Sequence, residues 1–227
     1  MSSDRAMRLT NKIKFYSAEE WVSLVKKFGL RAILKHRDYR ELFYCYPLLI
    51  LEIVASGHRI LMGKLLNSDD PFDVVFLPET LHNIYRAGQY RLKGSDGIWI
   101  QFKEIKSFTE KNKIDIDKWA DFVRREYIDK IKKGVKLNPP GGILHLHNRL
   151  LFNPIKKSKL ENALMGLKIP FEFPYKYVSL TIETTNAGGG DWRALTYQLH
   201  PGFKFIFDMN QENYLNTKHI ELVSLLR

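Results

Sequence analysis

Two periods of hydrophobic and polar positions recur along the chain, one typical of helices and one typical of strands. An S-x-x-E capping box begins at Ser17, apolar residues follow every three or four positions, and Gly29 ends the pattern, so we predict a helix here. A second helix is predicted from about Tyr39 to Ser56. Pro47 lies inside it, and a proline within a helix costs about 3 kcal/mol. The helix therefore either bends at Pro47 or begins near it.

Period-two runs and one further helical run complete the first two thirds of the chain. Strands are predicted at residues 58–63, 71–77, 97–106 and 143–147. A helix is predicted over residues 115–134, where apolar residues recur every four positions. The segment between the second and third strands, residues 78–97, is interpreted as an insertion. The predicted order from residue 39 to 147 is therefore helix, three strands, helix, strand.

The last third of the chain is predicted to be rich in strands. Residues 176–185 and 192–200 alternate as a hairpin joined by "NAGGGD", and residues 203–210 add a third strand after "HPG". We expect an α/β fold, of the α+β kind with a mixed sheet, in three segments: an N-terminal helical segment (1–38), a core (39–150) and a C-terminal β-rich elaboration (151–227). One compact unit is expected.

Composition and charge narrow the class of protein. The 227 residues are 44% hydrophobic and 27% charged, and they suffice to bury a core. No apolar run reaches the roughly 20 residues of a membrane span, and no signal peptide is recognised, so we expect no membrane association and a cytoplasmic location. The single Cys45 excludes an internal disulfide and a cysteine-based zinc site. The net charge of +11 favours a polyanionic partner.

The stretch "GIWIQFKEIKS" (97–107) carries the candidate chemistry. Strand alternation places Gln101 and Lys103 together on one face and the apolar residues on the other. Asp73 lies on the preceding predicted strand. A second frame, Glu104-x-Lys106, lies on the apolar face and is less favoured.

An Asp on one central strand, an x-Lys pair on the next and the order helix, three strands, helix, strand resemble the restriction-endonuclease-like, or PD-(D/E)XK, nuclease superfamily. The resemblance covers residues 39–147 and rests on "DPFDVVFL" and "GIWIQFKEIK". It implies that Asp73 and Gln101 bind a divalent metal and that Lys103 assists attack on the phosphodiester. Asp70 competes with Asp73 but lies in the preceding turn.

Gln101 departs from the Glu or Asp of most of the family and is similar to the Gln-x-Lys of methyl-directed restriction enzymes. A neutral amide oxygen can bind Mg²⁺, but it brings one negative charge fewer. The family often supplies a further acid from the preceding helix. Glu41 and Glu52 are the candidates, 11 residues apart and thus about three turns, and we favour Glu52.

The resemblance implies a metal-dependent endonuclease acting on double-stranded DNA, most naturally a type II-like restriction endonuclease that works as a homodimer. The implied cofactor is Mg²⁺, with Mn²⁺ as a substitute. The basic residues selected for DNA binding are Lys106, Arg124, Lys156, Lys157 and Arg193. The alternative is a non-catalytic nucleic-acid-binding protein with a decayed nuclease site, and a basic scaffold protein ranks third.

Two weaker signals remain. His145 and His147 share a strand face and form a possible metal pair, although strand histidines are more often hydrogen-bonded. The loop "NAGGGDW" lacks the G-K-[ST] ending of a P-loop and is interpreted as a hairpin tip beside Arg193. Nearby aromatic residues would stack on bases or pack in the core, with core packing favoured: Tyr175, Tyr177, Trp192 and Tyr197.

Overall fold

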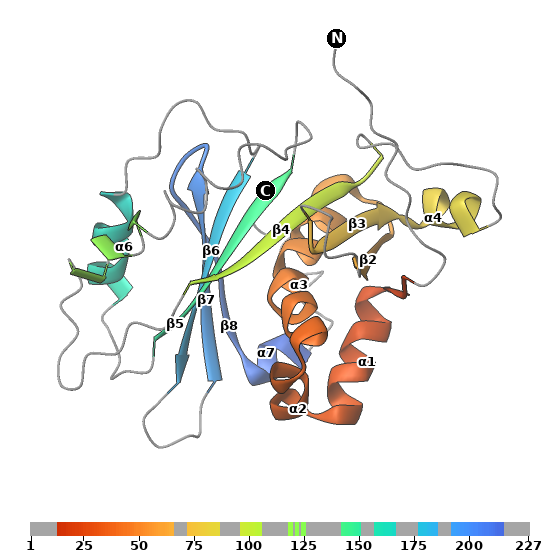
Figure 1. The fold of residues 1–227 in the computed structure, drawn as a ribbon, viewed down its shortest axis with the longest axis horizontal. Coiled ribbons are helices and arrows are strands. Elements are labelled where there is room, and N and C mark those ends of the chain that lie inside the picture. Colours follow the sequence, from red (N-terminus) through yellow and green to blue (C-terminus); the bar gives the residue numbers. More distant parts are fainter. Residues whose placement is uncertain are drawn as a thin grey trace, which may run out of the picture. The chain divides into compact units, whose positions relative to one another are not determined.

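The computed structural model describes residues 13–65, 72–86, 96–105, 142–150, 157–166, 177–185 and 192–215, together with six residues between 118 and 125. They form a mixed α/β fold (Figure 1). The chain divides into two compact units, residues 1–101 with 212–227 and residues 102–211. The division falls within strand β4 (Ile98–Ile105). In the described part of the chain, no helix is long and apolar enough to cross a membrane.

The first unit combines helices with antiparallel strands. Strands β1, β2, β3 and the first half of β4 are hydrogen-bonded in that order, and each adjacent pair is antiparallel. The elements are β1 (Phe15–Tyr16), α1 (Ala18–Phe28), α2 (Leu30–Lys35), α3 (Arg37–Ser56), β2 (Ile60–Lys64), β3 (Val74–Pro78), α4 (Glu79–Arg86) and α7 (Gln211–Leu215), the last belonging to this unit from Glu212 on.

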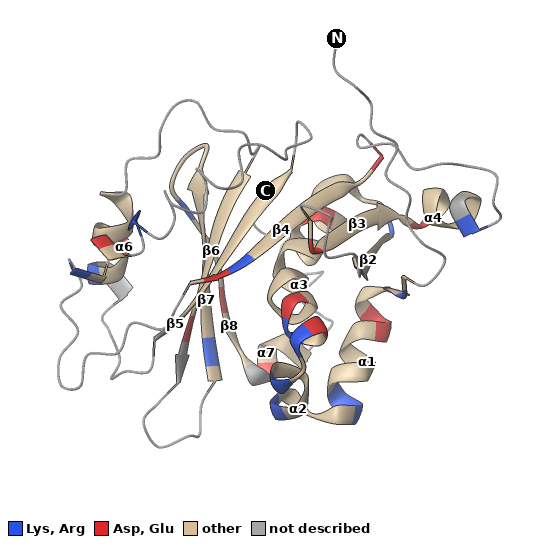
Figure 2. Cartoon of the chain, viewed as in Figure 1, with Lys and Arg blue, Asp and Glu red and all other residues tan. Residues whose placement is uncertain are grey.

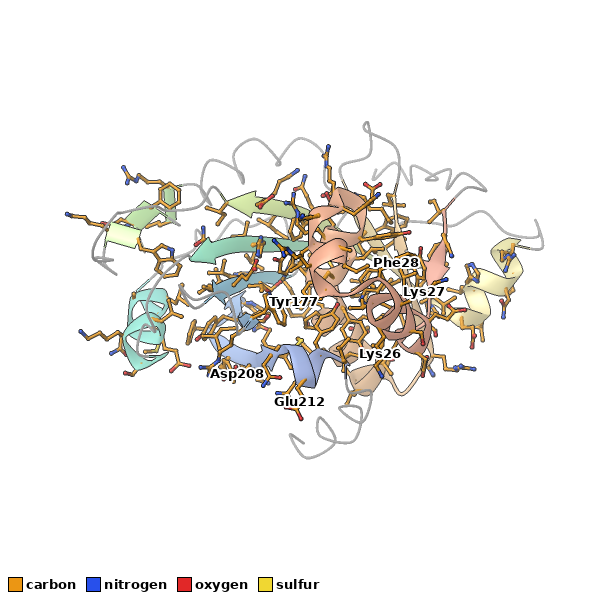
Figure 3. All side chains as sticks on the ribbon, turned by 90° about the horizontal axis from the view of Figure 1, so that it is seen from below. Lys26, Lys27, Phe28, Tyr177, Asp208 and Glu212 are labelled. Carbon is orange, nitrogen blue, oxygen red and sulfur yellow. The ribbon has the colours of Figure 1, made fainter. Side chains whose placement is uncertain are left out.

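The predicted capping box at the start of α1 is confirmed. The backbone N–H of Glu20 donates to Ser17 Oγ at 3.2 Å, and the Glu20 carboxylate accepts from the Ser17 N–H at 2.9 Å. Gly29 ends the helix at φ +80°, a conformation that favours glycine. The exposed end of α1, with Lys26, Lys27 and Phe28, is labelled in Figure 3.

Helix α3 passes through Pro47 rather than beginning near it. Proline has no N–H, so it cannot donate to the carbonyl of Phe43 four residues earlier. The hydroxyl of Tyr214, on α7, donates to that carbonyl instead at 3.0 Å. Trp21 Nε1 in turn donates to the Tyr214 hydroxyl at 2.8 Å. Tyr214 thus supplies the hydrogen bond that the helix cannot make for itself, and Trp21 holds the Tyr214 hydroxyl in place.

The second unit is built on strands of both orientations. Strand β5 (Ile143–Leu150) pairs in parallel with β6 (Tyr177–Thr185), which continues antiparallel into β7 (Trp192–His200) and β8 (Lys204–Asn210). Helix α6 (Lys157–Met165) packs its buried leucines against one face of these strands. The core on that face is formed by Leu144, Leu146, Leu160, Leu164, Val178, Leu180, Ile182, Leu195, Tyr197 and Leu199.

The predicted strands and the hairpin of the last third are confirmed, with shifted ends. Four helices and a short strand were not predicted: α2, α4, α6, α7 and β1. Helix α4 occupies the first part of the segment interpreted as an insertion, and β5 extends three residues beyond its predicted end. Of the predicted helix 115–134, six residues between 118 and 125 are helical, and the others lie outside the described residues.

Candidate functional site

Two acidic side chains and one lysine meet at one end of strands β2 and β3. Lys64 Nζ donates to Glu41 Oε2 and lies 3.9 Å from Asp73 Oδ1. The Glu41 side chain is 7% exposed, that of Lys64 14% and that of Asp73 25%. We call these three residues the acid–lysine cluster. Most of its charge lies away from water, where unpaired charges are costly.

Each member of the cluster is positioned by a different element. Glu41 is a buried residue of α3, and the charged residues of that helix, apart from Glu52, lie within its first five positions (Figure 2). Lys64 is the last residue of β2 and pairs with Val74 on β3. The N–H of Leu65 donates to the carbonyl of Asp73 at 2.9 Å, so the backbones that carry Lys64 and Asp73 are joined beside the cluster. The lysine and aspartate are therefore fixed to each other by backbone hydrogen bonds.

The electrostatics of the cluster couple its members. Burial raises the pKa of Glu41, the hydrogen bond and charge of Lys64 lower it, and the charge of Asp73 raises it again. Arg37, one helical turn before Glu41, contributes a further cation at 3.7 Å, but its side chain is 83% exposed. Burial, followed by the charges of Glu41 and Asp73, also raises the pKa of the Cys45 thiol. Of the two cations beside Glu41, Lys64 is therefore the one that is largely buried, and Arg37 is exposed.

Glu41, and not the favoured Glu52, is the helix acid that belongs to the acid–lysine cluster. Glu52 lies about 16 Å further along α3, as the rise per residue requires. It lines a pocket of about 260 Å³ with Pro78 and Ile98, at the opposite end of β3 from Asp73. The spacing of about three turns allowed both acids to face the same way, and Glu52 was preferred because it lies after Pro47, in the half of the helix predicted more firmly. Two residues on the same side of a helix can still lie far apart along the helix axis.

The position of Gln101 follows from the strand register. Lys64 pairs with Val74, and Val74 pairs with Ile100, so these three side chains share one face. Gln101 comes next after Ile100, and alternation directs its side chain to the opposite face of β4. Its side chain is buried, with 8% exposed. The register thus brings Ile100 to the face that carries Lys64. The same antiparallel register places the backbone of Gln101 beside that of Asp73, whose N–H donates to the carbonyl of Ile100 at 2.9 Å.

The remaining residues of the two candidate frames follow Gln101 on β4. Lys103 shares the face of Gln101 and is half-buried. Glu104, from the less favoured frame, shares the face of Ile100 and is exposed. Its partner Lys106 lies outside the described residues, as does Asp70.

The chemistry of the acid–lysine cluster fits a hard divalent cation in part. Carboxylate oxygens such as those of Glu41 and Asp73 are the ligands that Mg²⁺ prefers. Among the described residues, no group of three or more His, Cys, Asp or Glu side chains is arranged to hold a metal ion. A metal here would therefore depend on two carboxylates, with other oxygen ligands, and would meet the ammonium of Lys64.

The residues selected for DNA binding have different surroundings. Arg124 is exposed. Arg193 on β7 donates from Nε to Asp208 Oδ1 at 2.7 Å and from Nη2 to Asp208 Oδ2, on the adjacent strand β8. Asp208 is labelled in Figure 3. Lys106, Lys156 and the side chain of Lys157 lie outside the described residues. Arg193 is thus already engaged by a carboxylate.

The two candidate metal histidines belong to a buried polar face in the second unit. His145 Nδ1 lies 2.7 Å from Ser179 Oγ, and its Nε2 lies 3.3 Å from Thr181 Oγ1. His147 Nε2 lies 3.4 Å from Glu183 Oε2, and both side chains are at most 3% exposed. Burial, and secondarily the charge of His147, lowers the pKa of His145 to about 3. Hydrogen bonding within the unit engages both ring nitrogens of His145.

Of the aromatic residues named for stacking, Trp192 and Tyr197 are buried in the second unit, as their favoured role in core packing predicts. Tyr177 is 37% exposed, and Tyr175 lies outside the described residues.

Lys64 was missed by the sequence reasoning, although a signal was present. It is the charged residue that ends the apolar run "ILMG" on β2, nine residues before Asp73. A lysine at the end of a buried strand must find a counter-charge or reach solvent. No model of a known protein family matches this chain, and no curated protein matches it either.

Proposed function

We propose that the protein is a metal-dependent endonuclease that hydrolyses phosphodiester bonds in double-stranded DNA, of the type II-like restriction endonuclease class. The observation that supports it is that Glu41 from α3 and Asp73, the residue before β3, both lie beside the ammonium of Lys64. The order α3, β2, β3, β4 and β5, with α4 between β3 and β4, supports the helix–strand order on which the resemblance to the PD-(D/E)XK superfamily rests, and of the helix expected between β4 and β5 six residues are described. In that resemblance Glu41 takes the place proposed for Glu52.

Asp73 and Glu41 would hold Mg²⁺, or Mn²⁺ in its place, with oxygen ligands. The bound ion would polarise the scissile phosphate and lower the pKa of an attacking water. Lys103 is proposed to stabilise charge on the phosphate, and Gln101 to add an amide oxygen. Gln101 requires a separate test, because its backbone lies beside that of Asp73 while strand alternation directs its side chain away from the face of Lys64.

The charge of the whole chain supports a nucleic-acid partner. A net charge of +11 attracts a polyanion and releases counterions on binding. We propose that the enzyme acts as a two-fold dimer, which cuts both strands symmetrically. We place it in the cytoplasm, where its single thiol, Cys45, stays reduced.

One observation favours a second function, a nucleic-acid-binding protein whose nuclease site has decayed. In the resemblance Gln101 stands where most of the family has an acid, and the ammonium of Lys64 already neutralises Glu41. A site that carries its own cation can be stable without metal. In this case DNA binding would persist and cleavage would be absent.

Cleavage of plasmid DNA separates the two functions. Wild type with Mg²⁺ should convert supercoiled plasmid to open-circle and linear forms, and the same sample with a chelator should not. Asp73→Asn should reduce the rate by at least 100-fold, because it removes a charged ligand while keeping the shape of the side chain. Asp38→Asn, a partly buried acid in the first turn of α3, serves as the matched control.

The same plasmid assay distinguishes the Gln101-x-Lys103 frame from the Glu104-x-Lys106 frame. Gln101→Ala and Lys103→Ala should abolish cleavage if the Gln-x-Lys frame is used, whereas Glu104→Gln should abolish it if the other frame is used. If the wild type and all variants bind DNA equally and none of them cleaves it, the result would support the binding protein with a decayed nuclease site. Absence of both binding and cleavage would reject both functions and leave the scaffold protein.

A further inference from the structure

Lys64 lies beside the two carboxylates that would hold a metal ion. Its ammonium contacts Glu41 Oε2 and lies 3.9 Å from Asp73 Oδ1, so it is close to both carboxylates. Because the side chains of Lys64 and Glu41 are 14% and 7% exposed, little water is present to screen these charges. The ammonium therefore performs the neutralising role that a bound cation would perform.

The backbone holds Lys64 at this position, but the ammonium itself can move. Lys64 is anchored by its pairing with Val74, and the next residue bonds to the carbonyl of Asp73. Lysine carries its charge on a flexible four-carbon stem and does not have the fixed fork of arginine. The anchored backbone and mobile tip allow the ammonium to leave the carboxylates without unfolding β2.

A divalent ion and this ammonium cannot share the carboxylates at low cost. At a given distance, the repulsion between a divalent ion and the lysine ammonium is twice the repulsion between two monovalent cations. Two carboxylates balance one divalent ion, and with Lys64 also present the cluster would carry excess positive charge. Binding of the metal and retention of the Lys64 contact therefore oppose each other.

We propose that Lys64 is an internal cation that competes with the divalent metal for Glu41 and Asp73, and that metal binding displaces its ammonium. This inference rests on the proposed function, since it concerns the same acids. It assigns Lys64 a regulatory role: the lysine stabilises the metal-free site and lowers its affinity for metal. DNA phosphate, which attracts the displaced ammonium, would then favour metal binding.

Direct titration of Mn²⁺ tests the competition without measuring cleavage. Free Mn²⁺ is followed by electron paramagnetic resonance at fixed pH and ionic strength, with wild type, Lys64→Met and Lys26→Met. Lys26 is an exposed lysine near the end of α1, so it matches the change in net charge. Lys64→Met should bind Mn²⁺ at least tenfold more tightly than wild type, and Lys26→Met should bind as wild type does. Equal or weaker binding by Lys64→Met overturns the inference.

A second measurement on the wild type avoids any folding defect of Lys64→Met. Reductive methylation of lysines is followed residue by residue with mass spectrometry, with and without saturating Mn²⁺. Release of the ammonium should raise the reaction rate of Lys64 severalfold and leave that of Lys26 unchanged. Where the wild type binds Mn²⁺, a Lys64 rate that Mn²⁺ leaves unchanged or lowers overturns the inference. Absence of Mn²⁺ binding in both the wild type and Lys64→Met also overturns it.

The outcomes separate this inference from the proposed function. Metal-dependent cleavage by wild type with no gain in Mn²⁺ affinity in Lys64→Met rejects the competition and retains the nuclease. Mn²⁺ binding by Lys64→Met but not by wild type supports the competition and rejects a metal-dependent activity of the natural chain.

Discussion

The hydroxyl of Tyr214 donates a hydrogen bond to the carbonyl of Phe43, 3.0 Å away, at the point where Pro47 leaves helix α3 without a donor. Both side chains are buried, and their rings stack with centroids 4.1 Å apart. A residue near the end of the described chain thus completes a helix near its beginning. This contact ties α7 to α3 within the first unit.

Tyr214→Phe should lower the free energy of unfolding by about 1–3 kcal/mol, because it leaves both the Phe43 carbonyl and the Trp21 indole N–H without this buried partner. In a Pro47→Ala background the helix regains an N–H for Phe43, so the same substitution should cost about 1 kcal/mol less. Urea unfolding of the wild type, the two single variants and the double variant measures the difference. Strict additivity would show that Pro47 is not the reason for the Tyr214 contact.

Stability should depend on pH through His145. Its pKa is about 3 in the folded protein against 6.5 for a free imidazole, because burial disfavours the charged ring. The unfolded chain therefore binds the extra proton between pH 3 and 6.5. The stabilising contribution is complete above pH 6.5 and falls as the pH is lowered towards 3, at roughly 1.4 kcal/mol per pH unit.

Urea unfolding at pH 7.0 and 5.0 checks this dependence. His145→Gln keeps polar atoms for Ser179 and Thr181 but does not titrate, so its loss of stability should be smaller than that of the wild type by about 2 kcal/mol. His58→Gln changes an exposed histidine and should retain the wild-type dependence. Equal losses in His145→Gln and wild type would contradict the assignment to His145.

Glu41 and Glu52 form a matched pair on one helix. Glu41→Gln should weaken Mn²⁺ binding by at least tenfold and reduce Mg²⁺-dependent cleavage, since Glu41 is the acid that shares Lys64 with Asp73. Glu52→Gln should leave both quantities within twofold of wild type, because Glu52 lines the pocket at the other end of β3. Calorimetric titration and the plasmid assay measure them, and the reverse ranking would restore Glu52 as the metal ligand.

Asp208→Asn should increase affinity for double-stranded DNA if the β7–β8 hairpin contacts it. The substitution removes the carboxylate that engages Arg193, whose side chain is 53% exposed. Affinity at low salt should rise two- to fivefold, and the slope of log K against log salt should steepen by up to about one. Glu212→Gln makes the same charge change at another exposed residue and serves as the control. Glu212 and Asp208 are both labelled in Figure 3.

A gain in affinity equal in Asp208→Asn and Glu212→Gln would indicate a general effect of net charge and no direct contact of Arg193 with DNA. The stability of Asp208→Asn should change by less than about 1 kcal/mol in either case, because exposed ion pairs contribute little.

Local patterns predicted the fold well where a signal lies within a few residues. The capping box at Ser17, the glycine after α1 and the alternation of β6 and β7 each reflect backbone or side-chain contacts between near neighbours. The unpredicted elements are short, such as α2 and α7, or polar, such as α4. Short helices depend on tertiary packing more than on intrinsic propensity, so their own sequences carry little signal.

The sequence by itself determined that helix α3, three strands and their acidic residues follow in this order, because periodicity and charge are properties of the chain. Only the tertiary structure decided that Glu41 contacts Lys64 beside Asp73 and that Glu52 lies at the other end of β3. The physical reason is that a residue's height along a helix has meaning only relative to the strands packed against it. The same packing gave Lys64 its buried counter-charge, which no spacing in the sequence encodes.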